Sequence, residues 1–149
     1  MSPMLERLKK DLEHDEGVRH DIYLDHLGLK TGGCGHFIRP DEPEYVQPVG
    51  TTISAKRVDE WFSVDIENCL QDCANIFKNW EELPDEAQCI LGNMAFNLGA
   101  TRLRRFRRMI DAIHREDFEA AADEMHDSRW RRQVPQRAGR LIARMRAIA

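Results

Sequence analysis

Apolar residues recur every three or four positions over much of the chain, and the longest such series follows Ser54. Positions three and four apart share one face of an α-helix, so the series predicts a long helix over 54–78. Ser54 is a suitable N-cap for it, because its hydroxyl can accept a hydrogen bond from the first turn. The predicted buried stripe consists of Val58, Trp61, Phe62, Ile66, Cys69, Leu70, Cys73, Ile76 and Phe77.

A second helical pattern begins close to the N-terminus. Ser2 and Pro3 are typical of a helix start, and Gly17 is typical of a helix end, which places Glu16 at the C-terminal edge. The residues in between that repeat at helical spacing are Met4, Leu5, Leu8 and Leu12. Residues 18–38 lack this periodicity, and their glycines favour a small β-hairpin or meander.

The remainder of the chain also favours helices. Pro84 opens a helix whose nearly continuous apolar run indicates a centrally buried element, and Gly99 closes it. Residues 39–52 contain three prolines and many acids, and we expect an irregular surface loop there. The further elements that we expect are helices at about 102–114 and 116–126, a turn around Trp130, and a last helix over about 136–147.

These elements predict a mainly helical α+β fold. We expect residues 1–149 to form a single domain with two lobes: a small N-terminal β-lobe over about 17–53, and a helical lobe that consists of about 54–149 and the N-terminal helix. The long helix would bridge the lobes, and the cleft between them is the natural place for a ligand.

Composition narrows the function classes. The chain has 149 residues, of which 42% are hydrophobic, and no apolar run approaches the ~20 residues that span a bilayer. The first sixteen residues are charged and lack the apolar core of a signal peptide, which predicts a protein made and kept in the cytoplasm. We expect no stable membrane insertion, and a monomer is the default expectation.

The net charge of −4 is unevenly distributed. Residues 1–100 carry 9 Lys and Arg against 19 Asp and Glu, whereas residues 101–149 carry 13 Arg against 7 Asp and Glu. Guanidinium groups bind carboxylates and phosphates, so the arginine-rich half suggests an anionic polymer as a partner. The alternative interpretation is that these arginines simply form the solvent-exposed surface of helices. The acidic first hundred residues and the lack of a binding motif argue against nucleic acid.

The cysteines are Cys34, Cys69, Cys73 and Cys89. A chain kept in the cytoplasm has little use for disulfides, and no cysteine pair shows the usual two-residue spacing of metal ligands. We therefore expect buried apolar thiols, and no metal or organic cofactor.

Two carboxylates and a hydroxyl stand out near the N-terminus. Glu16 precedes Asp25 by nine residues, and Thr31 follows six later, directly before the glycine-punctuated run Gly32-Gly33-Cys34-Gly35-His36. Cleavage of a glycosidic bond needs an acid for the leaving oxygen and a second carboxylate on the other face of the sugar. Such a pair on one turn-rich segment is suited to that reaction, although the spacing alone is common.

The surrounding motifs resemble those of the T-even phage lysozymes, glycoside hydrolase family 24. The matching residues are Glu16-Gly17, Tyr23-Leu24-Asp25 and Gly28-Leu29-Lys30-Thr31-Gly32-Gly33-Cys34-Gly35-His36. Further matches are Asn93-Met94-Ala95-Phe96-Asn97-Leu98-Gly99 and Ser128-Arg129-Trp130 with Gln133, Pro135, Arg137 and Ala138. The matches follow one another in order along nearly the whole chain. Gly32 departs from the family, which usually has an apolar β-former there.

The resemblance implies an inverting glycoside hydrolase. Glu16 would be the general acid, which needs a carboxyl group that still holds its proton near neutral pH. Asp25 and the Thr31 hydroxyl would position a water for attack on the anomeric carbon. In such enzymes the two carboxyl groups stand roughly 6.5–9.5 Å apart.

Further roles are implied by the same resemblance. His36 and Asp65 would form a buried structural pair, in which the anion raises the histidine pKa. Arg137 would approach and orient Glu16, although a purely structural role is equally open. The candidates for binding the sugar are Phe37, Phe96, Asn97, Gln133 and Arg137, with packing in the core as the alternative for Phe96.

The implied activity is an endolysin that hydrolyses the β-1,4 bond between N-acetylmuramic acid and N-acetylglucosamine in peptidoglycan and lyses the host cell. It would wait in the host cytoplasm until a separate pore released it to the cell wall. Anionic envelope polymers would be further partners of the arginine-rich half. The alternatives are a lytic transglycosylase, which needs only the acid, and a non-catalytic wall-binding or virion protein.

Overall fold

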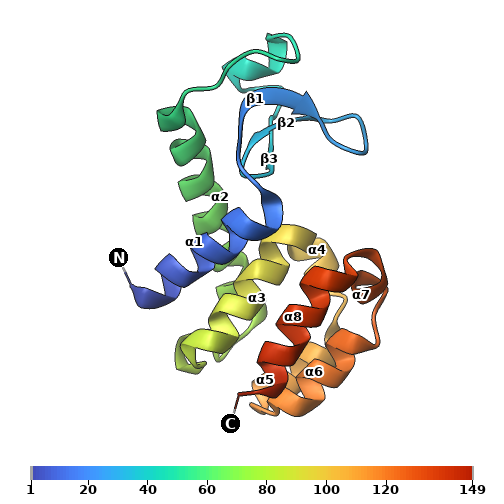
Figure 1. The fold of residues 1–149 in the computed structure, drawn as a ribbon. Coiled ribbons are helices and arrows are strands. Elements are labelled where there is room, and N and C mark those ends of the chain that lie inside the picture. Colours follow the sequence, from blue (N-terminus) through green and yellow to red (C-terminus); the bar gives the residue numbers. More distant parts are fainter. Residues whose placement is uncertain (1, 149) are drawn as a thin grey trace. The chain divides into compact units, whose positions relative to one another are not determined.

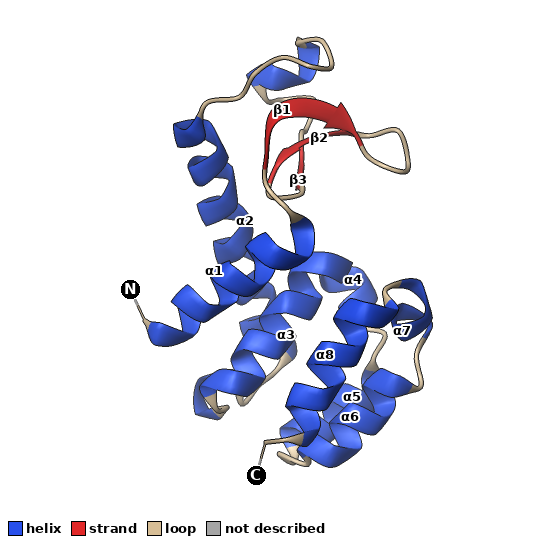
Figure 2. Cartoon of the chain, viewed as in Figure 1, coloured by secondary structure: helices blue, strands red, loops and turns tan. Residues whose placement is uncertain are grey.

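The computed structural model describes residues 2–148. Its secondary structure is mainly helical with one small antiparallel sheet, which confirms the α+β fold class (Figure 2). No helix in the described part of the chain is long and apolar enough to cross a membrane. The elements in chain order are α1 (Pro3–Glu16), β1 (Arg19–Leu24), β2 (Lys30–Gly33), β3 (His36–Phe37), η1 (Pro43–Val46), α2 (Ala55–Ile76), η2 (Trp80–Glu82), α3 (Asp85–Leu98), α4 (Ala100–Leu103), α5 (Arg107–His114), α6 (Phe118–His126), α7 (Arg129–Gln133) and α8 (Pro135–Arg146).

The chain divides into two compact units. Lys9–Glu67 forms one, here called the sheet unit, and the rest of the described chain forms the other, here called the helical unit. Both boundaries fall within helices: α1 and α2 each contribute residues to both units (Figure 1).

The predicted helix caps are present. The Ser2 hydroxyl accepts a hydrogen bond from Leu5 N at 3.1 Å, and the Ser54 hydroxyl accepts one from Arg57 N at 3.1 Å. Gly17 ends α1 with a φ of +72°, a conformation that favours glycine.

The sheet unit is organised around the order β1-β2-β3. One face of the sheet contributes to a buried cluster of Ile22, Ile38, Ile53, Val58 and Trp61. The departure at Gly32 follows from this packing, because a Cβ there would lie 2.6 Å from Ile53 Cδ1 and 3.1 Å from Trp61 Cζ3. Trp61 therefore occupies space that a larger residue in β2 would need.

The helical unit has a larger core, in which α3 is almost wholly buried. The four cysteines of the chain are all buried, as predicted. In the helical unit, Cys73 packs with its Sγ 3.6 Å from the Leu91 carbonyl oxygen, and burial raises the pKa of its thiol far above the ordinary value.

The prediction of one helix over 102–114 is wrong. The segment is divided into α4 and α5, and the intervening turn has hydrogen bonds from Arg105 N to Arg102 O and from Phe106 N to Leu103 O. These bonds span three residues rather than four, so they tighten the chain and end α4. The break allows the Phe106 ring to pack edge-on against Trp130, with centroids 6.3 Å apart.

Candidate active site

Glu16 is the last residue of α1 and is partly buried. The turn between β2 and β3 approaches it closely at Gly35, where a Cβ would lie 2.8 Å from Glu16 Oε1. Gly35 also has a φ of +64°, which side chains disfavour. This glycine of the motif therefore permits both the turn and its close approach to the Glu16 carboxylate.

Asp25 follows β1 and begins the turn into β2. Its Oδ1 accepts hydrogen bonds from the backbone N–H groups of Leu27 at 2.8 Å and Leu29 at 2.9 Å. Its Oδ2 has no hydrogen-bond donor among residues 2–148, and the side chain is partly exposed. One oxygen thus fixes the orientation of the carboxylate while the other is open to a ligand.

Thr31 lies on β2, and its side chain is buried. Its Oγ1 donates a hydrogen bond to the Leu29 carbonyl oxygen at 2.9 Å, and the same oxygen accepts one from Asp25 N at 2.9 Å. Because Leu29 N–H also binds Asp25 Oδ1, the backbone of this one residue orients both candidate side chains.

The sheet register places further side chains beside Thr31. Thr31 pairs with Tyr23 on β1 and with Phe37 on β3, and directly paired residues project from the same face. The Phe37 side chain is 46% exposed on this face, so its ring is accessible to a ligand.

The pKa of Tyr23, the partner of Thr31 on β1, depends on the charges around it. Burial raises the pKa of Tyr23, the nearby Arg19 guanidinium opposes that rise, and the negative charges of Glu16 and Asp25 add to it. The phenol thus lies within the electrostatic influence of both carboxylates. All three predicted catalytic residues belong to the sheet unit, and the separation of their carboxyl groups stays a prediction.

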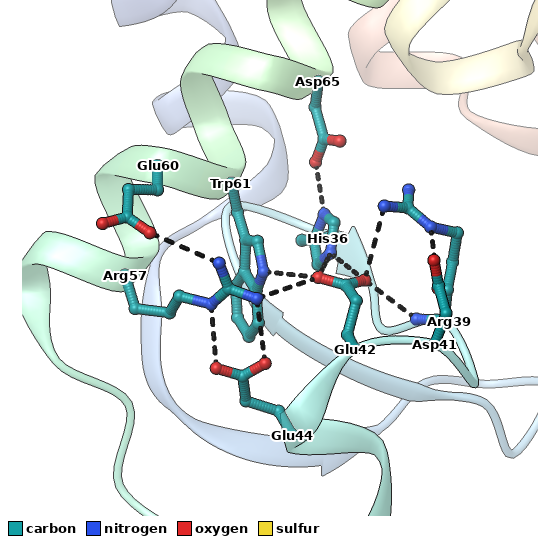
Figure 3. A network of polar contacts seen from close by, with 9 residues as sticks. All are labelled: His36, Arg39, Asp41, Glu42, Glu44, Arg57, Glu60, Trp61 and Asp65. Carbon is teal, nitrogen blue, oxygen red and sulfur yellow. Dashed lines mark hydrogen bonds and ion pairs between the residues drawn. The ribbon is translucent and has the colours of Figure 1, made fainter.

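The structure brings His36 and Asp65 together. His36 Nδ1 lies 2.6 Å from Asp65 Oδ2, and its Nε2 lies 2.9 Å from Glu42 Oε1 (Figure 3). Burial lowers the pKa of His36, but the hydrogen bonds and charges of Asp65 and Glu42 outweigh it, so the pKa is raised overall. An imidazolium ring with two N–H donors satisfies both carboxylates.

Glu42 is the centre of this network, and the sequence analysis missed it. Besides His36, its carboxylate accepts a hydrogen bond from Trp61 Nε1 at 2.7 Å and lies 3.3 Å from Arg57 Nη2 (Figure 3). Burial raises the pKa of Glu42. The hydrogen bond from the Arg39 backbone N–H and the interaction with His36 together lower it by more, so the pKa of Glu42 is lowered overall. Glu42 stands in the acidic 39–52 segment, where nothing local distinguishes it from its exposed neighbours.

The other predicted binding residues belong to the helical unit. Asn97 Oδ1 accepts a hydrogen bond from Trp130 Nε1 at 2.8 Å, and Gln133 Oε1 accepts one from Arg102 Nη2 at 2.9 Å. Phe96 is partly buried against the core, as its alternative interpretation expected. Their roles in binding sugar stay predictions.

Arg137 is buried, and its Nε donates a hydrogen bond to Asn93 Oδ1 at 2.8 Å. This contact anchors the guanidinium group within the helical unit. Its approach to Glu16 stays a prediction.

Residues 2–148 contain no group of three or more His, Cys, Asp or Glu side chains arranged to hold a metal ion. The chemistry that Glu16, Asp25 and Thr31 offer is the proton transfer and hydrogen bonding of two carboxylates and a hydroxyl.

Comparison with known proteins points to one family. The family model described as phage lysozyme matches residues 13–147. A protein of Dictyostelium discoideum named probable T4-type lysozyme 2 is 27% identical, and the alignment covers 94% of each chain. The peptidoglycan hydrolase gp36 of Pseudomonas phage phiKMV is 28% identical over 92% of this chain, but the match covers only 15% of that protein. The pre-baseplate central spike protein Gp5 of Enterobacteria phage T4 is 26% identical over 87% of this chain and 26% of its own length.

Proposed function

The chain belongs to the phage lysozyme family and is a glycoside hydrolase, and on this premise we propose that it hydrolyses bacterial peptidoglycan. The bond cleaved is the β-1,4 linkage between N-acetylmuramic acid and N-acetylglucosamine, and the outcome is lysis of the host cell. The observation that carries the proposal is the pairing of Asp25 and Thr31 through the backbone of Leu29.

That pairing is suited to holding a nucleophilic water. The Thr31 hydroxyl proton is engaged with the Leu29 carbonyl, so toward a water the Thr31 oxygen acts as an acceptor. Asp25 Oδ2 is a second acceptor. A water that donates both of its protons to these oxygens presents a lone pair to the anomeric carbon. Asp25 takes up the proton that the water loses on attack.

Glu16 supplies the proton for the other half of the reaction. It donates this proton to the glycosidic oxygen as the bond to the anomeric carbon breaks. Because the water attacks from the face opposite the leaving group, the configuration at the anomeric carbon inverts. Gly35 supports the role of Glu16, since it leaves room for the carboxylate beside the turn.

The residues proposed to bind the sugar are Phe37, Phe96, Asn97, Gln133 and Arg137. The exposed Phe37 ring beside Thr31 suits the apolar face of a pyranose. Asn97 and Gln133 offer amide groups to hydroxyls and N-acetyl groups, with Phe96 and Arg137 completing the predicted set.

The enzyme is proposed to remain in the host cytoplasm until a separate pore releases it to the wall. Fractionation of infected cells before and after pore opening tests this step, because the protein should move from the cytoplasmic to the periplasmic fraction. Its presence in the periplasm before pore opening would contradict the proposal.

The activity is tested on purified peptidoglycan with the wild type and Glu16→Gln. The variant keeps the shape of the side chain but has no proton to donate, so the rate should fall by ~10²- to 10⁴-fold. Mass spectrometry should find hydrolysed, reducing muropeptides. Products 18 mass units lighter would be anhydro-sugars and would identify a lytic transglycosylase. No release by the wild type would favour a wall-binding or virion protein.

A further inference from the structure

The helical unit contains a surface cavity of about 590 Å³. Buried apolar side chains, among them Leu98, Met109 and Trp130, form part of its lining. The Phe106 ring, which packs edge-on against Trp130, also lines it. The cavity lies beside the break between α4 and α5, since Arg105 and Phe106 of that turn are part of its wall.

Positive charge dominates the rest of the lining. The two carboxylates in the wall are Glu124 and Asp127, and neither forms an ion pair with any of the lining arginines within residues 2–148. Apart from a hydrogen bond between Arg102 and Gln133, the guanidinium groups have no side-chain partner in the described chain. The arginines that line the cavity are Arg102, Arg105, Arg107, Arg108 and Arg129.

The backbone adds to this positive potential. Arg107 and Arg108 occupy the first turn of α5, which contains no acidic residue and is not capped by a side chain. The N-terminal end of a helix carries partial positive charge, so cations placed there are unfavourable unless an anion compensates them. The arginines around the cavity also repel one another, and a bound anion would relieve that repulsion.

We propose that this cavity binds a phosphate group, in the form of a phosphomonoester or a diphosphate carried by a molecule with an apolar or sugar portion. Phosphate is favoured over a single carboxylate by charge and shape. It carries close to two negative charges at neutral pH and has three oxygens, which can accept hydrogen bonds from several guanidinium groups at once. The apolar part of the wall accommodates the body of the ligand.

The proposal goes beyond the hydrolytic reaction and does not depend on it. It gives the expected affinity of the arginine-rich half for anionic envelope polymers a defined location and ligand chemistry. Two sources of the phosphate are distinguished experimentally: a phosphate-bearing envelope glycolipid and a free soluble diphosphate.

Isothermal titration calorimetry with inorganic diphosphate tests the site at constant ionic strength. The double variant R105Q/R108Q removes two guanidinium groups from the wall, and its affinity should fall at least ~10-fold. R104Q/R132Q is the matched control, since both arginines are exposed residues of the same unit that do not line the cavity. This control should bind within about twofold of the wild type. Diphosphate should also shift the backbone amide NMR signals of residues 106–109.

Further ligands distinguish the two sources of the phosphate and test whether the cavity prefers phosphate. Co-sedimentation with phosphatidylcholine vesicles that contain a bisphosphorylated glycolipid, lost in R105Q/R108Q, would support the envelope source. Binding of free diphosphate without vesicle binding would support a soluble ligand. Equal loss in the two double variants would overturn the proposal, because the attraction would then be a property of net charge. Succinate binding as tightly as diphosphate, or duplex DNA binding more tightly through the same two arginines, would also overturn it.

Discussion

The arginines of the sheet unit and the arginines that line the cavity of the helical unit differ in whether they have acidic partners. Every arginine of the sheet unit lies within ion-pair distance of a carboxylate: Arg19 of Asp21, Arg39 of Asp41, and Arg57 of Glu44. In the helical unit, none of the arginines that line the cavity has such a partner in the described chain. Charges paired inside a unit stabilise its fold, whereas charges left without an internal partner are available to a ligand.

The same contrast exists within the sheet unit on a smaller scale. Glu42 is buried and engaged by His36, Trp61 and Arg57, whereas Asp25 keeps one oxygen open. Substitution of the first should therefore affect folding, and substitution of the second should affect catalysis. The predictions below separate these two kinds of carboxylate.

The largest effect is expected from Asp25→Asn. The amide oxygen can still accept the bonds from Leu27 and Leu29, so the turn should keep its shape. The group can no longer take a proton from water, and the rate of peptidoglycan hydrolysis should fall by ~10²- to 10⁴-fold. Asp21→Asn, which changes the same charge on β1, is the control and should stay near the wild-type rate. A melting temperature lowered along with the activity would indicate a structural role for Asp25.

Glu42→Ala should instead lower the free energy of unfolding by about 3–5 kcal/mol, because it leaves His36, Arg57 and the Trp61 N–H without their shared acceptor. Chemical denaturation measures this loss. Glu60→Ala is the comparison, since Glu60 is exposed, and it should cost less than about 1 kcal/mol. Equal losses in the two variants would mean that Glu42 does not organise the network.

Gly32→Ala should cost about 1–3 kcal/mol of stability through overpacking against Ile53 and Trp61. The double variant Gly32→Ala with Ile53→Val removes the nearest methyl group and should recover part of the loss. Differential scanning calorimetry compares the variants. Unchanged stability in the single variant would contradict this prediction, because it would show that Ile53 and Trp61 can move aside for a Cβ at little cost.

The smallest effect is the pH dependence of stability. The raised pKa of His36 means that its contribution is complete below the ordinary value of 6.5 and is lost as the pH rises through the folded value. The lowered pKa of Glu42 means that its contribution is complete above 4.5 and is lost as the pH falls through its folded value. The network should therefore stabilise most between about pH 4.5 and 6.5. Melting curves of the wild type and His36→Asn should differ most in that interval and converge at higher pH.

The sequence predicted best those features that depend on neighbours along the chain. Ser2, Ser54 and Gly17 begin or end helices through contacts within four residues, and each lies where its pattern indicated. The break after α4 was missed because the apolar spacing continues through it. At the break, Phe106 packs against Trp130, which is distant in sequence, so local spacing carries no sign of it.

The candidate site follows the same division. The motif predicted Glu16, Asp25 and Thr31 as candidates, but the hydrogen bonds that support the proposed role of Asp25 and Thr31 depend on the turn geometry at Leu29. Glu42 could not be distinguished from the exposed acids of its segment, because its burial depends on partners 6 to 19 residues away. Long-range packing thus decides which carboxylates support the structure.

The stereochemistry of hydrolysis is the most direct test of the proposal that Asp25 and Thr31 hold the attacking water. Proton NMR of purified, uncross-linked glycan strands, recorded within the first minutes of reaction, identifies the anomer formed at the new reducing end. Attack by that water predicts the α-anomer first, followed by slow mutarotation. Initial formation of the β-anomer, or of a 1,6-anhydro product, would contradict the account.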